Sequence, residues 1–193
     1  MRLVVLACVL AACHPYVAGG VSPAWKTKGP LAQAVGENAT SRTAAGEAPA
    51  PATTGNSYEL ELGSSYHYFF VGVNAQIHDV TTASMRALAY NTPTDATPRY
   101  VNATATLEVA WAWLHYSWLS SYIHAGPARS ILYDRMGPST WGFGYRYGGA
   151  IAVSKEALSI YADLYKTGLV FGDGPADGFS STTGVTVGIA FRR

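Results

Sequence analysis

Strict alternation of apolar and polar residues is the feature that most constrains the fold of this chain. Between residues 100 and 113, Val101 and every second residue through Trp113 form an apolar face, while polar residues such as Thr104 and Thr106 lie on the other. Successive side chains of a β-strand point to opposite faces, so this pattern indicates a strand with two unlike faces. The alternation recurs over 66–77, 141–153, 158–167 and 182–191, and more weakly over 57–63, 82–90 and 116–125. We therefore expect an all-β chain with eight strands.

The predicted connections between these strands alternate in length. Counted back from the C-terminus, longer connections at 172–181, 125–140 and 91–99 alternate with short ones at 154–157, near His115 and at 78–81. An even number of antiparallel strands with short periplasmic turns and longer outer loops is typical of outer-membrane barrels. The sequence therefore predicts an eight-stranded antiparallel up-and-down β-barrel with both termini in the periplasm.

Composition excludes several other classes of protein. Charged residues make up only 13% of the chain and the net charge is +1, so there is no basic surplus for binding nucleic acid. Hydrophobic residues reach 49% and aromatic residues 12%, which excludes a wholly disordered chain. No apolar run is long enough for a transmembrane helix.

The first thirteen residues have the character of an export signal. Arg2 precedes an apolar stretch over residues 3–10, and small residues follow. The end of this segment, Leu10-Ala11-Ala12-Cys13, resembles the lipobox of bacterial lipoproteins, which implies lipidation of Cys13. The alternative is a plain export signal that is cut later, near Ala18.

Residues 14–56 differ in composition from the rest of the chain. They are rich in Ala, Gly, Pro and Thr, and only two aromatic residues, Tyr16 and Trp25, precede residue 57. So little bulky apolar surface predicts a flexible linker, followed by a folded barrel domain over 57–193. Both cysteines, Cys8 and Cys13, lie in the signal segment, so we expect no disulfide, no metal site and no cofactor.

The C-terminal segment carries a family resemblance. Val185, Val187, Ile189 and Phe191 alternate with small or polar residues, and this segment resembles the closing-strand signal of outer-membrane proteins. The predicted hairpin over 141–168 is similar to those of small eight-stranded outer-membrane barrels of the OmpA transmembrane-domain type. The resemblance covers residues 57–193. It implies location in the outer membrane of a Gram-negative bacterium and recognition by the barrel assembly machinery, but no particular activity.

Charged residues on the polar faces of the strands predict a network in the lumen. If the apolar faces meet lipid, Glu108, Arg146, Asp163 and Arg86 point inward. Buried charges need partners, so we expect Arg146 to pair with Asp163 or Glu108. Asp163 is favoured because its strand follows that of Arg146. Such a network either gates a narrow pore or only satisfies its own charges.

Aromatic residues near the predicted strand ends indicate two interfacial belts. Trp111 and Trp113 lie at one end of their strand, whereas Tyr90, Tyr100 and Trp141 lie near the predicted outer loops. Tryptophan and tyrosine are enriched where a membrane meets water.

Three classes of function remain open. The favoured one is a monomeric, non-enzymatic outer-membrane barrel with a structural or loop-mediated binding role and no open pore, whose partners are outer-membrane lipid and lipopolysaccharide. The alternative is a lipid-anchored soluble barrel, similar to a lipocalin, with its apolar face turned inward around a small hydrophobic ligand. The third is a lipid A-modifying hydrolase that would use His115 and Ser117, which share a strand face.

Overall fold

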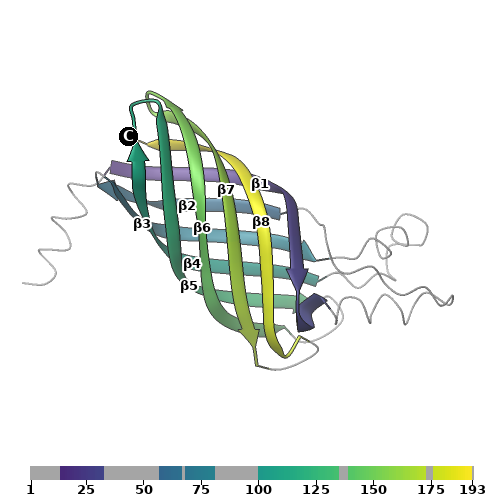
Figure 1. Cartoon of the computed structure of the whole chain (residues 1–193). Helices are drawn as coiled ribbons and strands as arrows, with labels where there is room; N and C mark the ends of the chain where they lie inside the picture. Colours follow the sequence, from purple (N-terminus) through teal and green to yellow (C-terminus); the bar gives the residue numbers. More distant parts are fainter. Residues whose placement is uncertain are drawn as a thin grey trace, which may run out of the picture.

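The chain folds into a closed antiparallel barrel in the computed structural model, with each strand paired to its neighbours in sequence and β8 paired to β1 (Figure 1). The structure describes residues 14–32, 57–66, 68–80, 100–134, 139–172 and 176–192. The eight strands are β1 (His14–Lys28), β2 (Ser57–Tyr66), β3 (Phe69–Val80), β4 (Tyr100–His115), β5 (Leu119–Asp134), β6 (Thr140–Lys155), β7 (Leu158–Phe171) and β8 (Gly178–Arg192). The predicted fold class, an eight-stranded up-and-down barrel, is confirmed.

Strand β1 lies where the composition predicts a linker. Val17 of β1 pairs with Leu62 of β2 on one side and with Phe191 of β8 on the other. The linker prediction is therefore wrong for residues 14–28, while 33–56 lie outside the described residues. The small residues of β1 have a packing role, because a Cβ on Gly20 would lie 2.6 Å from the Thr186 side chain and 2.9 Å from the Tyr161 hydroxyl oxygen.

Strand β5 extends through most of the segment predicted to be a loop at 125–140. Gly126 and Pro127, which indicate a turn in the sequence, lie inside β5 and face Arg146 and Tyr145 of β6. The loop prediction is wrong because β4 pairs with the backbone of β5 on both sides of Gly126 and Pro127. Gly126 has no side chain and so leaves room for the backbone of Leu107 in β4. The weak strand predicted over 82–90 lies outside the described residues.

The connections between strands place the start of β1 and the end of β8 at the same end of the barrel. Short connections at 67–68, 116–118 and 156–157 join β2 to β3, β4 to β5 and β6 to β7 at one end of the barrel. The other connections, at 29–56, 81–99, 135–139 and 172–177, join strands at the opposite end. Strand β1 begins and β8 ends at the short-turn end, as Figure 1 shows for the C-terminus.

The barrel has an apolar outer wall and a polar interior. In β4, the outward side chains of Leu107 and Val109 are 56% and 52% exposed, whereas Thr106 and Glu108 are buried. The outward positions of the other strands carry Val, Ile, Leu, Phe, Tyr and Trp in the same way. The lipocalin-like alternative, which requires an apolar interior, is therefore wrong. No helix among the described residues is long and apolar enough to cross a membrane.

Deletion of β1 tests whether residues 14–28 close the barrel. Without them β2 and β8 would each keep an unpaired edge, which hydrocarbon does not tolerate. We expect the deleted chain to lose the difference in SDS-gel mobility between unboiled and boiled samples that folded barrels display. Deletion of 38–52, a segment of equal length in the connection between β1 and β2, is the matched control and should keep the difference. A mobility difference that survives removal of β1 would contradict this closure.

Candidate functional site

A polar network crosses the lumen near the middle of the strands. Ser22 bonds to Thr186, which donates to Glu59, and Arg146 links Glu59 to the carboxylate of Asp163. Hydrogen bonds connect the whole network, which contains one side chain from each of the eight strands. In strand order these side chains are Ser22, Glu59, Gln76, Glu108, His124, Arg146, Asp163 and Thr186. All eight strands are thereby joined through their side chains as well as through their backbones.

Arg146 lies at the centre of this network. Its side chain is 1% exposed, and its Nη2 donates to Glu59 Oε2 and to Asp163 Oδ2 at 2.9 Å each. Its Nη1 lies 3.7 Å from Glu108 Oε2, and the guanidinium carbon lies 4.8 Å from the centre of the Tyr165 ring. Three carboxylates around the guanidinium offset its buried charge, although only Nη2 is hydrogen-bonded and Nε and Nη1 have no hydrogen-bond partner among the described residues.

His124 forms the second junction of the network. Its Nδ1 is hydrogen-bonded to Glu108, and its Nε2 lies 2.8 Å from Asp163 Oδ1. The imidazole therefore connects β4 to β7 across the lumen. Because Glu108 and Asp163 also neighbour Arg146, the two basic side chains share the same pair of carboxylates.

The structure brings three of the four predicted network residues together. Glu108, Arg146 and Asp163 are in contact, and Arg86 lies outside the described residues. The sequence reasoning did not pair Arg146 with Glu59, because β2 and β6 lie on opposite sides of the barrel and their distance depends on closure. It also missed His124, whose strand has weak alternation at its start. A histidine on the polar face of that strand was the available signal.

An apolar cluster closes the lumen nearer the long connections. Gly29 adopts a positive φ of 94°, and the chain turns so that Leu31 is 1% exposed and its backbone N–H donates to Ser180 Oγ at 3.0 Å. Leu31 packs in a cluster of buried side chains that includes Trp25, Ala128, Leu132, Leu169, Phe171 and Ala176. This cluster fills part of the barrel interior between the polar network and the long connections.

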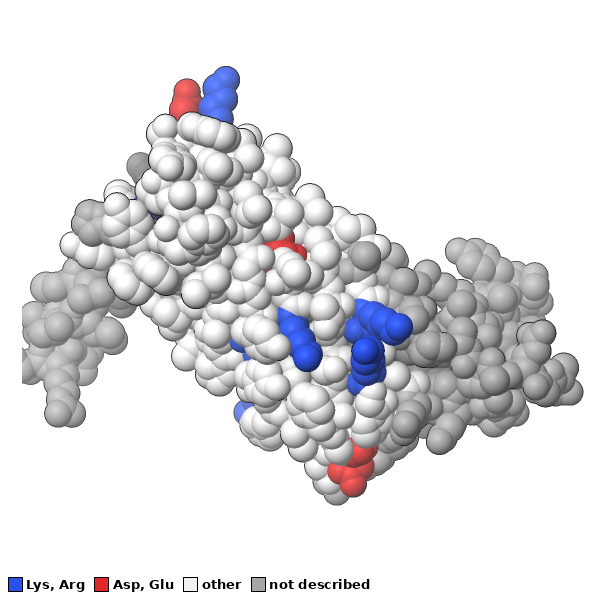
Figure 2. Space-filling view, in the orientation of Figure 1, with Lys and Arg blue, Asp and Glu red and all other residues white. Residues whose placement is uncertain are grey.

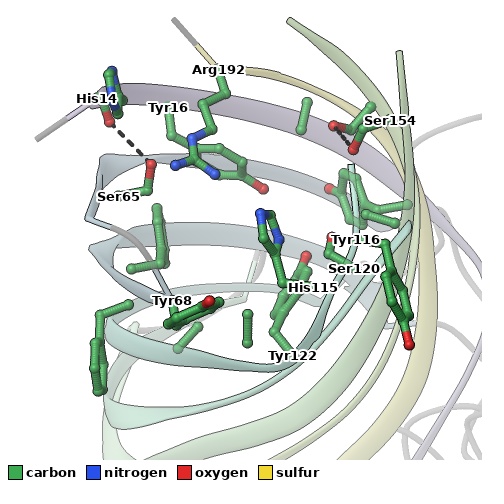
Figure 3. A pocket seen from close by; sticks show the side chains of 18 of the residues that line it. His14, Tyr16, Ser65, Tyr68, His115, Tyr116, Ser120, Tyr122, Ser154 and Arg192 are labelled. Atoms are coloured by element: carbon green, nitrogen blue, oxygen red, sulfur yellow. Dashed lines mark hydrogen bonds between the residues drawn. The ribbon is translucent and has the colours of Figure 1, made fainter. Parts of the chain in front are cut away.

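A cavity of about 470 Å³ opens at the short-turn end of the barrel (Figure 3). Tyr16, Tyr122 and Tyr161 line it, and the small side chains of Ala110, Ala152 and Ala190 leave the space unfilled. Figure 3 shows His14 and Arg192 near its rim and Tyr122 deeper inside. The cavity is therefore a polar and aromatic recess that ends inside the lumen.

His115 and Ser117, the pair considered for hydrolysis, both line this cavity. The ring of His115 lies edge-to-face with Tyr68, with ring centres 5.8 Å apart. Within the described part of the chain, no hydrogen bond joins His115 to Ser117 or to a carboxylate, and no group of three or more His, Cys, Asp or Glu side chains could hold a metal ion. In the described residues, His115 and Ser117 are therefore not arranged as a hydrogen-bonded base and nucleophile.

Three of the residues predicted to form aromatic belts lie on the outer wall. Trp111 and Trp113 are exposed near the short-turn end of β4, and Trp141 is exposed near the opposite end of β6. Tyr100 is the first residue of β4, and Tyr90 lies outside the described residues.

The C-terminal signal residues all lie in β8. Val187, Ile189 and Phe191 are exposed on the outer wall and Val185 is half-buried, and the strand pairs with both β7 and β1. Cys13 lies outside the described residues.

Replacement of Arg146 by methionine tests the role of the network. The change keeps most of the side-chain volume but leaves the buried carboxylates of Glu59 and Asp163 without their cation, which should lower the free energy of unfolding by about 3–5 kcal/mol. Arg129→Met is the matched control, because Arg129 is exposed and stacks over Trp141 on the outer wall, and it should cost at most about 1 kcal/mol. Urea unfolding in detergent micelles measures both. Equal stability of the Arg146→Met and Arg129→Met variants would count against the network.

No protein-family model matches the chain, and no curated protein matches its sequence. Solved structures do match. Neisserial surface protein A (NspA) is 12% identical with a TM-score of 0.56, over 92% of this chain and 96% of that one. A major outer membrane protein from Thermus thermophilus is 12% identical with a TM-score of 0.55, over 94% and 100%.

A third similar structure is Ail, the attachment invasion locus protein of Yersinia pestis, in complex with the heparin analogue sucrose octasulfate. It is 9% identical with a TM-score of 0.52, over 94% of this chain and 99% of that one. At such low identities these likenesses establish the fold, and the fold of this chain is a barrel of the outer-membrane type.

Proposed function

We propose that this chain is an integral outer-membrane β-barrel of a Gram-negative bacterium, with a structural role or a binding role carried by its long connections. It is neither an enzyme nor an open pore in this proposal. One observation carries it, namely that an apolar outer wall surrounds a lumen crossed by the polar network of Arg146. Strands of 10 to 16 residues have the length needed to cross a bilayer at a tilt.

We infer the orientation in the membrane from the lengths of the connections. Outer-membrane barrels carry short turns on the periplasmic side and longer loops outside. The long connections at 29–56 and 81–99 would then face the exterior, and the ends of the barrel at His14 and Arg192 would face the periplasm. Lipidation of Cys13, one residue before β1, would hold the start of the barrel close to the inner leaflet.

The proposed partners are those of a monomeric barrel in its membrane. Outer-membrane lipid and lipopolysaccharide would contact the apolar wall and its aromatic residues, among them Trp111 and Trp141. The barrel assembly machinery would recognise β8, where Ile189 and Phe191 continue the apolar alternation to the end of the strand.

Fractionation of cells that express the full chain tests the membrane assignment. We expect the chain in the outer membrane after washing with alkaline carbonate, because its outer wall is apolar from β1 to β8. A Cys13→Ala variant is included to remove any contribution of a lipid anchor, and it should resist extraction as well. Release of this variant by carbonate would contradict an integral barrel.

Electrical recording tests the closed lumen. The chain reconstituted in a planar bilayer should give no stable stepwise conductance, since the network of Arg146 and the cluster around Leu31 block the lumen at two levels. A large porin reconstituted in the same way serves as the positive control. Reproducible conductance steps of one size from the purified chain would reject the proposal of a closed barrel.

A further inference from the structure

Three lysines gather on the outer wall across neighbouring strands. Lys26 of β1 and Lys166 of β7 each pair in register with Thr183 of β8, which lies between them. Strands in a sheet lie about 4.8 Å apart, so the two lysine backbones are about 10 Å apart. Lys28 is two residues from Lys26 on the same face and pairs with Ser181. The ammonium groups of these three lysines and the hydroxyls of Ser181 and Thr183 thus belong to one part of the outer wall.

A hollow in the wall coincides with this lysine cluster. Its volume is about 500 Å³, and Lys26, Lys28, Lys166, Ser181 and Thr183 all line it. Figure 2 shows blue side chains gathered on this side of the barrel toward the long connections, on a wall that is otherwise white over much of its area. The cluster is therefore a local charge on a surface that is mostly neutral.

Nothing on the surrounding strands neutralises the lysine cluster. The sequences of β1, β6 and β8 contain no Asp or Glu. The carboxylates of β2 and β7, which are Glu59, Glu61 and Asp163, are buried in the lumen. In the part of the chain that the structure describes, no ion pair involves any of the three lysines.

The position of the lysine cluster on the outer wall indicates where an anion that binds the lysines would come from. Leu164 and Val185 line the same hollow on the side of the apolar wall, and Tyr147 pairs in register with Lys166. Lysine is unfavourable against hydrocarbon but is tolerated near the membrane interface, where its long stem packs on apolar surface and its ammonium group reaches the headgroups. An anion at this place would belong to a lipid whose chains cover the wall beside it.

We infer that Lys26, Lys28 and Lys166 form a binding site for the phosphate groups of an anionic lipid in the leaflet next to the long connections. This inference rests on the proposed function, because it requires the barrel to lie in a membrane. Each ammonium group donates charge-assisted hydrogen bonds to phosphate oxygens, and the hydroxyls of Ser181 and Thr183 can donate further ones. The site gives the barrel a preferred lipid on one side of its wall.

Lipid binding to the full chain tests the site. The probe is bis-phosphorylated lipid A, titrated into the purified barrel in a zwitterionic detergent and measured by native mass spectrometry, with phosphatidylcholine, a zwitterionic lipid of zero net charge, as the comparison. The variant K26Q/K28Q/K166Q should bind lipid A at least tenfold more weakly than the parent chain. The control K155Q/R192Q/R193Q has the same net charge and should bind like the parent. Arginine at all three lysine positions should restore binding.

Each other outcome overturns the inference. Equal lipid A binding by the glutamine variant and the parent would show that the lysines are only solvated charges. Displacement of the lipid by inorganic phosphate at the same concentration would assign the site to a soluble anion. Heat-dependent gel mobility and carbonate resistance, measured in parallel, distinguish failure of the lipid site from failure of the proposed membrane barrel. If both properties persist while lipid A binding is absent, only the lipid site is contradicted. Loss of membrane insertion by the parent chain would overturn both.

Discussion

The burial of the Arg146 guanidinium inside a barrel with an apolar exterior is the interaction on which the rest of the structure depends. Of its two short contacts, the one to Asp163 joins the adjacent strands β6 and β7, whereas the one to Glu59 on β2 joins strands that are far apart in the sequence. A buried charge is tolerated only when opposite charges lie beside it, and Arg146 of β6 lies beside Glu59 of β2 only in a closed barrel. Closure of the backbone and completion of the charge network therefore require each other, and pairing of β1 with β8 provides that closure.

The lumen is organised in three levels, and each level limits what the protein can do. The apolar cluster around Leu31 and Phe171 lies nearer the long connections, the network of Arg146 lies at the middle, and the cavity lined by Tyr16 and Tyr161 opens at the short-turn end. In the proposed function, a lumen filled in this way serves as a core and not as a channel. Interactions with other molecules are then left to the ends of the barrel and to its outer wall, which is where the lysine cluster lies.

Most of the fold could be predicted because alternation is strong where one face of a strand carries large apolar side chains and the other carries small or polar ones, as in β4 and β8. Strand β1 could not, since its faces near Gly20 are built from small residues whose role is evident only when Thr186 and Tyr161 pack against them. Some contacts of the polar network could likewise be predicted from the sequence, and others could not. Contact between Arg146 and Asp163 follows from adjacent strands, whereas the partnership of Arg146 with Glu59 depends on the stagger between strands across the lumen, which no local pattern encodes.

The central claim is that lipid meets the outside of the wall and the polar side chains fill the inside. Spin labels introduced one at a time from residue 103 to residue 109 of β4, in the barrel reconstituted in bilayers, test it most directly through their collisions with oxygen, which concentrates in hydrocarbon. The account predicts high accessibility to oxygen at 103, 105, 107 and 109 and low accessibility at 104, 106 and 108, in a period of two residues. High accessibility to a water-soluble relaxation agent at the odd-numbered positions, or no periodicity at all, would contradict it.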